Sequence, residues 1–217
     1  MRGLMSKVVP KICIVDYGMG NLGSVTNALE HAVECNVRIS NEKKELDSSD
    51  ILILPGVGSF NDAVENLRKR GLFDKLNDEV IYQKKPLMAI CLGMQVVMGS
   101  SEEGGLSQGF GWIPGNVTRF QAPDGFRVPH MGWDNIKVKK RDDLFEGIEQ
   151  SPDFYFVHSY HVNCDEQYVI ASCDYGYEFT AAIEKDNIVA FQFHPEKSHK
   201  NGLRLLSNYI NSIKVQL

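Results

Sequence analysis

The chain has 217 residues, of which 43% are hydrophobic, and a formal net charge of −5 at pH 7. This is enough apolar sequence to bury the core of one α/β domain. Its Lys and Arg residues are spread out, which argues against a nucleic-acid partner, and no apolar run reaches the roughly 20 residues of a membrane helix. The five cysteines include no Cys-x-x-Cys pair and suit a reducing compartment, so we expect a cytoplasmic protein.

In chain order, the first half alternates short apolar runs with helical patterns. The apolar runs cover 11–15, 36–40, 50–56 and 86–91, and helical patterns begin near Asn21 and cover about 60–70 and 72–83. This alternation predicts a parallel sheet with helices on both faces.

After about residue 105 the pattern changes to short strand-like pieces separated by Gly and Pro, such as FYFVHSYHV. We expect antiparallel hairpins that extend the same sheet, followed by a last helix over about 201–213. The predicted organisation is an N-terminal extension over 1–10 and one domain over 11–217.

The stretch DYGMGNLGS follows the first apolar run and contains Gly18, Gly20 and Gly23 in the spacing G-x-G-x-x-G. This spacing occurs in dinucleotide-binding loops, which also need an acidic residue at the end of the second strand. Here that strand ends in Ser40-Asn41, and Glu42 lies beyond it. The fingerprint is incomplete, so a tight turn with close helix packing, or a surface for another protein, remain the alternatives.

Cys91 lies where a predicted buried strand runs directly into a helix. Ala89 and Gly93 flank it at two residues on either side, which is the arrangement of a nucleophile elbow. A helix N-terminus favours the thiolate form of a cysteine, and the N–H of Leu92 then points where an oxyanion forms. The alternative is an inert buried cysteine at a strand end.

A base for this cysteine is predicted in the segment VAFQFHPEKS. Residues two apart in an extended segment project to the same side, so Glu196 can hold one nitrogen of His194 while the other takes a proton from Cys91. A surface turn is the alternative for this segment. In α/β-hydrolases the acid precedes the histidine, so the order found here indicates a different family.

Six segments together resemble the class I glutamine amidotransferases, and among them the glutaminase subunits of imidazole glycerol phosphate synthases. They are DYGMGNLGS, ILPGVGSF, AICLGMQ, VPHMGW, FYFVHSYHV and FQFHPEKS. The resemblance implies a flavodoxin-like α/β fold with a mostly parallel sheet, antiparallel in its C-terminal half. It also implies a triad in which Cys91 attacks the glutamine amide, His194 is base and then acid, and Glu196 orients His194.

The resemblance implies further roles. The Val57 peptide joins Leu92 in the oxyanion hole, and the glycines beside it allow that peptide to turn. The residues matching positions that hold glutamine are Gly56, Gly58, Gln95, His158, Ser159 and Tyr160, and those matching the partner interface are Asn21, Trp133, Tyr155 and Lys197.

The remaining histidines carry no predicted chemistry. His158 and His161 could form half of a metal site, but no further ligands complete it, so we expect neither metal nor cofactor. We interpret His31, His130 and His199 as surface or packing residues.

Ammonia released in water becomes ammonium, so a second active site must receive it directly. In the resembled enzymes this site belongs to a (β/α)8 cyclase subunit, and we expect a heterodimer with such a partner, with glutamine as substrate and histidine biosynthesis as the pathway. Three alternatives stay open: a paralogous glutaminase for amidation of a surface-polysaccharide sugar, a non-catalytic regulatory module, and a cysteine peptidase.

Overall fold

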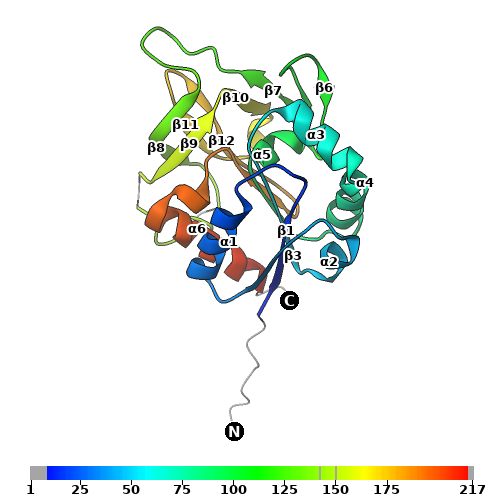
Figure 1. The fold of residues 1–217 in the computed structure, drawn as a ribbon. Helices are drawn as coiled ribbons and strands as arrows, with labels where there is room; N and C mark the ends of the chain where they lie inside the picture. The colour runs from blue at the N-terminus through cyan, green and yellow to red at the C-terminus, as the bar shows by residue number, and fades with distance from the viewer. Residues whose placement is uncertain (1–8, 142, 150, 215–217) are drawn as a thin grey trace.

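A computed structural model describes residues 9–141, 143–149 and 151–214, and these form a nine-stranded mixed sheet with a smaller four-stranded sheet (Figure 1). The large sheet has the order β2-β1-β3-β4-β13-β12-β11-β8-β9, parallel from β2 to β13 and antiparallel beyond. Its strands, in chain order, are β1 (Lys11–Val15), β2 (Asn36–Ser40), β3 (Ile51–Gly56), β4 (Leu87–Cys91), β8 (His130–Val138), β9 (Asp153–His158), β11 (Val169–Asp174), β12 (Glu178–Lys185) and β13 (Ile188–Phe191).

Helices cover both faces of the large sheet, as the alternating pattern predicts. In Figure 1, α1 and α6 lie together on one side and α2, α3 and α4 on the other. Successive residues of β1 point to opposite faces, so Ile12 and Ile14 join one buried core while Cys13 and Val15 join the other. The helices are α1 (Leu22–Ala32), α2 (Lys43–Ser48), α3 (Phe60–Lys69), α4 (Leu72–Asn77), α5 (Leu92–Val96) and α6 (His199–Lys214), with a π-helix η1 (Asp78–Tyr82) and 3-10 turns η2 (Glu166–Tyr168) and η3 (Pro195–Lys197).

The parallel strands follow the flavodoxin-like order, which confirms the expected fold class. The order reverses between β1 and β3, and the carboxyl ends of β1, β3 and β4 lie next to each other at this point. In open α/β sheets a crevice outside such a switch point is the usual ligand site. The fold therefore brings the loop after Val15, the loop after Gly56 and Cys91 together at the carboxyl ends of the parallel strands.

The four-stranded sheet differs from the sequence-based expectation. Its order is β10-β7-β5-β6, with bounds β5 (Met98–Ser101), β6 (Ser107–Gln108), β7 (Ile113–Arg119) and β10 (Tyr160–Cys164). The expectation that all late strands extend one sheet is wrong, because the run FYFVHSYHV breaks at Ser159 and its two halves pair with β8 and β7 respectively. The Ser159 carbonyl accepts from the Phe120 N–H at 2.9 Å, which fixes the break.

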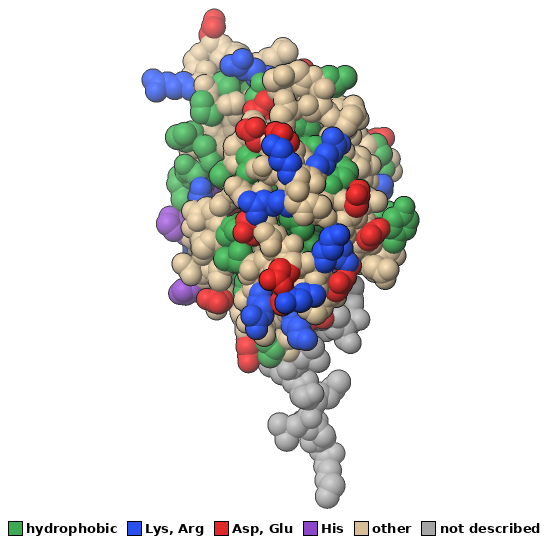
Figure 2. All heavy atoms as spheres, turned by 45° about the vertical axis from the view of Figure 1, so that its right-hand side comes forward, with side chains coloured by type: hydrophobic (Ala, Val, Ile, Leu, Met, Phe, Trp, Pro, Cys, Tyr) green, Lys and Arg blue, Asp and Glu red, His purple; other side chains and the backbone are tan. Residues whose placement is uncertain are grey.

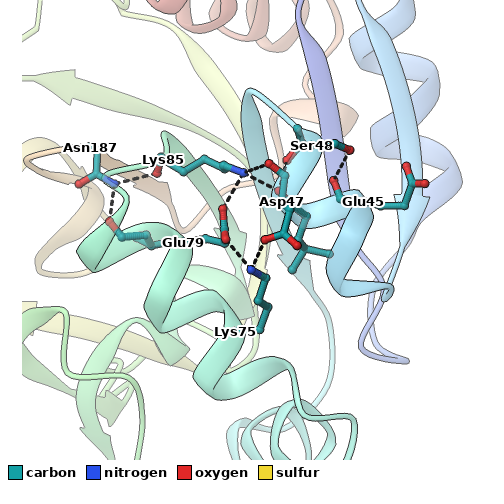
Figure 3. Close-up of polar contacts among 10 residues, drawn as sticks. Glu45, Asp47, Ser48, Lys75, Glu79, Lys85 and Asn187 are labelled. Carbon is teal, nitrogen blue, oxygen red and sulfur yellow. Dashed lines mark hydrogen bonds and ion pairs between the residues drawn. The ribbon is translucent and has the colours of Figure 1, made fainter.

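An ion-pair cluster lies beside β4 and is drawn in Figure 3. The Glu79 carboxylate, whose side chain is only 6% exposed, receives the ammonium groups of Lys75 and Lys85 at 2.6 Å each. Lys75 also pairs with Asp47 of α2, and Asn187 donates to the Lys85 carbonyl at 2.7 Å. The cluster ties α2 and α4 to the loop before β4, and η1 carries Glu79 where the sequence predicts a continuous helix over 72–83.

The chain joins the sheet at Pro10, whose carbonyl accepts from the Asn36 N–H at 2.9 Å. Residues 1–8 of the predicted extension lie outside the described residues. On the face in Figure 2, Lys and Arg side chains alternate with Asp and Glu rather than forming a stripe of one sign. No helix among the described residues is long and apolar enough to cross a membrane.

Candidate functional site

Cys91 ends β4 and precedes α5 without any intervening loop. Its backbone has φ 54° and ψ −107°, a conformation that costs a residue with a side chain about 1–3 kcal/mol and recurs at functional sites. The residue is 6% exposed. The strained turn is the one that the small residues Ala89 and Gly93 predict.

Gly93 explains how α5 can begin so close to the sheet. An added Cβ at this position would lie 1.9 Å from the Leu54 carbonyl oxygen, which belongs to the neighbouring strand β3. Gly56 serves the same purpose one strand away, since its added Cβ would lie 2.2 Å from the Tyr17 hydroxyl. Gly93 therefore lets α5 approach the backbone of β3, and Gly56 leaves room for the Tyr17 hydroxyl.

His194 and Glu196 lie at the start of η3, just beyond the carboxyl end of β13, which pairs with β4. The His194 Nδ1 is 2.7 Å from the Glu196 Oε1, and both side chains are 2% exposed. Nε2 of His194 is buried and has no hydrogen-bond partner among the described residues. The ring therefore has one nitrogen fixed by the carboxylate and the other free to interact with Cys91.

The electrostatics of the pair favour a charged imidazole. Burial alone lowers the pKa of His194, but the Cys91 thiolate and the Glu196 carboxylate outweigh burial and raise it above its ordinary value. A thiolate facing an imidazolium is the reactive form of a cysteine nucleophile.

Gln192 is a site residue that the sequence reasoning missed. The Tyr160 carbonyl can only accept, so Gln95 directs its Nε2 there at 3.0 Å and to the Gln192 Oε1 at 3.2 Å. This fixes the Gln192 amide, whose Nε2 faces the Cys91 Sγ at 3.7 Å. A signal was present in the sequence, because Gln192 lies two residues before His194 in the segment that follows the buried strand β13. The expected extended geometry ends at His194, and the 3-10 turn η3 brings the Glu196 carboxylate to the His194 ring instead.

A cavity of about 350 Å³ opens over Cys91. Of the sequence-predicted site residues it brings together Val57, Gly58, Cys91, Leu92, Gln95, His158, Ser159 and Tyr160, and it adds Glu103, Pro129 and Val157. Gly56, His194 and Glu196 lie outside this lining, and Gly56 pairs with Cys91 in the sheet register. The Val57 side chain is 42% exposed at the cavity.

Three of the four predicted interface residues form one surface cluster beside the site. Trp133 and Tyr155 pair across β8 and β9 with ring centroids 5.8 Å apart, and the Lys197 ammonium lies 5.7 Å from the Tyr155 ring. The fourth, Asn21, caps α1, its Oδ1 accepting from the Ser24 N–H at 3.3 Å. Asn21 directly precedes α1, which contacts η3, the turn that contains Lys197.

The structure divides the remaining histidines between surface and core. His31 is exposed, and His199 stacks on Trp133 at 4.8 Å, as surface residues would. His130 is instead 0% exposed and hydrogen-bonded on both ring nitrogens. Asp134 lies four residues away on β8 itself, whereas His158 is brought to His130 by the pairing of β8 with β9.

The family model for class I glutamine amidotransferases matches residues 13–212, nearly the whole domain. The chain belongs to the class I glutamine amidotransferase family. Among curated proteins this amidotransferase is similar to imidazole glycerol phosphate synthase subunit HisH 2 of Vibrio vulnificus strain YJ016, with 46% identity over 95% of this chain and 96% of the relative. It is also similar to subunit HisH 1 of Campylobacter jejuni strain 81-176, with 45% identity over 91% of this chain and 98% of the relative.

Solved structures support the amidotransferase fold. A putative GMP synthase protein from Thermoplasma acidophilum has a TM-score of 0.71 at 20% identity and covers 97% of this chain and 96% of its own. PurLQS from Thermotoga maritima has a TM-score of 0.70 at 20% identity and covers 94% of this chain and 99% of its own. At these identities the likeness establishes the fold alone.

Proposed function

We propose that this chain is the glutaminase subunit of an imidazole glycerol phosphate synthase. It hydrolyses glutamine to glutamate and ammonia, and the ammonia passes to a separate synthase subunit in histidine biosynthesis. The observation that carries the proposal is Cys91 on a strained turn under a cavity, beside a buried imidazole whose other nitrogen is held by Glu196. The similarity to HisH subunits over almost the whole chain supports the same assignment.

In the proposed reaction, the Cys91 thiolate attacks the carbonyl carbon of the glutamine side chain. His194 then gives its proton to the nitrogen, so that ammonia and not an amide anion leaves. The resulting thioester is hydrolysed by water, from which His194 takes a proton, and glutamate and the thiolate are released. Glu196 stabilises the charged imidazole in both steps.

The negative charge on the attacked oxygen requires backbone donors. The Leu92 N–H lies in the first turn of α5, where N–H groups have no partner within the helix. We assign the second donor to the Val57 peptide, which is followed by Gly58 at φ +114°. Gly56 and Gly58 lower the steric cost of turning that peptide, so the oxyanion hole can be completed on demand.

The cavity wall opposite Cys91 would hold the rest of the glutamine. Gln95, His158, Ser159 and Tyr160 lie along it. Because the Tyr160 carbonyl already accepts from Gln95 and from His158 Nδ1 at 2.8 Å, that oxygen serves to shape the wall. Glutamine would therefore hydrogen-bond to the other polar groups of residues 158–160.

The partner would be a (β/α)8 cyclase-type synthase subunit, bound as a heterodimer. The aromatic cluster of Trp133 and Tyr155, the capped start of α1 at Asn21, and Lys197 form the surface we assign to it. Trp133 and Met131 are 41% and 61% exposed on the same strand, which is unusual for large apolar residues and suits a protein interface. A cytoplasmic location suits five free thiols among the described residues.

The deciding experiment measures both half-reactions of the complex. Glutamine-dependent formation of imidazole glycerol phosphate should be lost in Cys91→Ala, while formation driven by added ammonium salt persists. Glutamate release by the isolated chain should be low and rise strongly with the partner and its acceptor. Equal glutaminase activity with and without the partner would contradict the oxyanion switch.

Interface variants make the partner assignment specific. Asn21→Ala and Trp133→Ala should weaken the partner-stimulated rate and leave the basal rate unchanged. Tyr82→Ala is the control. Tyr82 is 69% exposed but precedes β4, so it lies near the amino end of that strand, whereas Cys91 lies at its carboxyl end. Stimulation by a sugar-modifying synthase and its sugar acceptor instead would support amidation of a surface polysaccharide, and retained glutamine hydrolysis in Cys91→Ala would refute the catalytic assignment.

A further inference from the structure

A chain of three hydrogen bonds runs from the cavity wall to the protein surface. His158 Nδ1 lies 2.8 Å from the Tyr160 carbonyl oxygen, and His158 Nε2 lies 3.1 Å from His130 Nδ1. His130 Nε2 then lies 2.7 Å from the Asp134 carboxylate. Neither His130 nor Asp134 lines the cavity, and the proposed glutaminase mechanism uses neither of them.

Counting protons along this chain shows that it needs one more than neutral imidazoles supply. Both ends, a carbonyl and a carboxylate, can only accept. Three hydrogen bonds between them require three protons, and two neutral histidines carry one each. The third proton either charges one of the two imidazoles beside an ionised Asp134 or lies on Asp134 beside two neutral imidazoles. Because burial keeps His158 neutral, the proton is placed between His130 and Asp134.

The surroundings of His130 suit a shared positive charge. Its ring is stacked against Phe156, with centroids 4.8 Å apart at 22°, and against Tyr175, 4.0 Å apart at 23°. Aromatic faces attract cations. Burial lowers the pKa of His130, and the Asp134 carboxylate opposes this only in part, so it is the hydrogen-bond geometry that requires the shared proton. Burial also lowers the pKa of His158 to about 3 and keeps it neutral.

The proton can exchange with solvent through Asp134, whose side chain is 36% exposed. The other titratable or charged groups that face this chain come from several elements: Tyr175 after β11, His161 on β10 and His194 at η3, with Cys173 on β11, Lys137 on β8 and Tyr177 before β12 nearby. His161 takes no part in the three hydrogen bonds, because its ring nitrogens lie near the Tyr177 hydroxyl and the Val162 carbonyl.

We propose that His130 is a positioning residue, which shares one proton with Asp134 and, through His158, holds the turn at Ser159 and Tyr160 in the shape that binds glutamine. The proposal rests on the proposed function, since it takes the cavity to be the glutamine site. Phe120 also holds this turn. Its N–H donates to the Ser159 carbonyl, and its ring centroid lies 5.2 Å from that of His158.

Loss of the shared proton at high pH must break one of the three bonds. If His130 keeps its bond to Asp134, two nitrogen lone pairs face each other between His130 and His158. If His158 changes tautomer to relieve this, its bare Nδ1 faces the Tyr160 oxygen. In both cases the turn loses a fixed contact, so glutamine binding should weaken as pH rises while the triad remains intact.

The variant Asp134→Asn separates the proton from the hydrogen bonds. An amide can donate to His130 Nε2, so that His130 donates to His158 and all three bonds form between neutral groups. Wild-type KM for glutamine should rise at alkaline pH, and Asp134→Asn should remove that rise with little change in kcat. Asp165→Asn, which changes an exposed carboxylate on another element, should keep the wild-type pH profile.

His130→Leu removes the three-bond chain and should raise KM about tenfold over the wild type at neutral pH, or about 1.4 kcal/mol, and make KM independent of pH; this is within the range for a buried group left without its partner. The activity-independent readout is the NMR signal of labelled histidine and aspartate side chains in the full chain. A neutral His130 beside an ionised Asp134 at neutral pH would overturn the proposal, whatever the enzyme's activity. A KM profile in Asp134→Asn identical to that of the wild type would do so as well.

Discussion

The substitution Gly93→Ala tests how closely α5 must approach the sheet. An ideal Cβ at this position would lie 1.9 Å from the Leu54 carbonyl oxygen and 3.0 Å from the Leu54 carbonyl carbon. Real Cβ atoms essentially never come within 3.0 Å of such an atom. Because Leu54 is fully buried in a central strand, the helix must move and carry Cys91 with it.

The required displacement is about 1 Å or more, in an interior that is packed as densely as an organic crystal. Overpacking of this kind costs about 1–3 kcal/mol of the free energy of unfolding. A misplacement of about 1 Å at a reacting group can lower kcat about 10²-fold. We therefore expect Gly93→Ala to lose far more activity than its loss of stability explains.

The assay is glutamate release at saturating glutamine, with the fraction folded taken from denaturant unfolding of the same preparation. Gly23→Ala is the matched control, since an added Cβ in the first turn of α1 meets nothing within 4 Å. That control should gain about 0.5 kcal/mol of stability and keep its activity. A Gly93→Ala protein with wild-type stability and kcat would refute the close-packing argument.

Three further outcomes are expected. Gln192→Leu removes a donor that faces the Cys91 Sγ, so kcat for glutamate release should fall; an unchanged kcat would count against the contact. Glu196→Gln should lower the pKa of His194, seen by NMR, because one of the charges that raise it is gone, and should reduce kcat by about 10⁴-fold. Glu79→Ala leaves two buried ammonium groups poorly compensated and should cost about 3 kcal/mol in denaturant unfolding without changing kcat, whereas Glu65→Ala, from an exposed pair, should cost close to nothing.

The parallel half of the fold could be predicted from local patterns. Apolar runs of strand length alternating with helical periods specify a parallel sheet, because each element must bury its own apolar side. The short helix α2 and the π-helical turn η1 were missed. The i,i+4 spacing of Lys75 and Glu79 is typical of a helix, but the second pairing of Glu79, with Lys85, depends on the π-helical turn and has no sequence signature.

The candidate nucleophile and its base could also be read from sequence, because each depends on neighbours in the chain. Ala89 and Gly93 mark the turn at Cys91, and the two-residue spacing marks Glu196 as the partner of His194, although a 3-10 turn and not an extended strand brings the two side chains together. The meeting of the two segments depends on the parallel pairing of β4 with β13, which the order of apolar runs alone does not fix. The resemblance to a known family supplied that step.

The sequence by itself determined which residues are strained, apolar or able to react, since these properties depend on a few adjacent residues. Only the tertiary structure decided that the run from Asp153 to Cys164 divides between two sheets at Ser159, because strand pairing is set by partners far along the chain. The same division brings His130 against His158, and so turns an apparent packing residue into part of a proton-sharing chain behind the cavity.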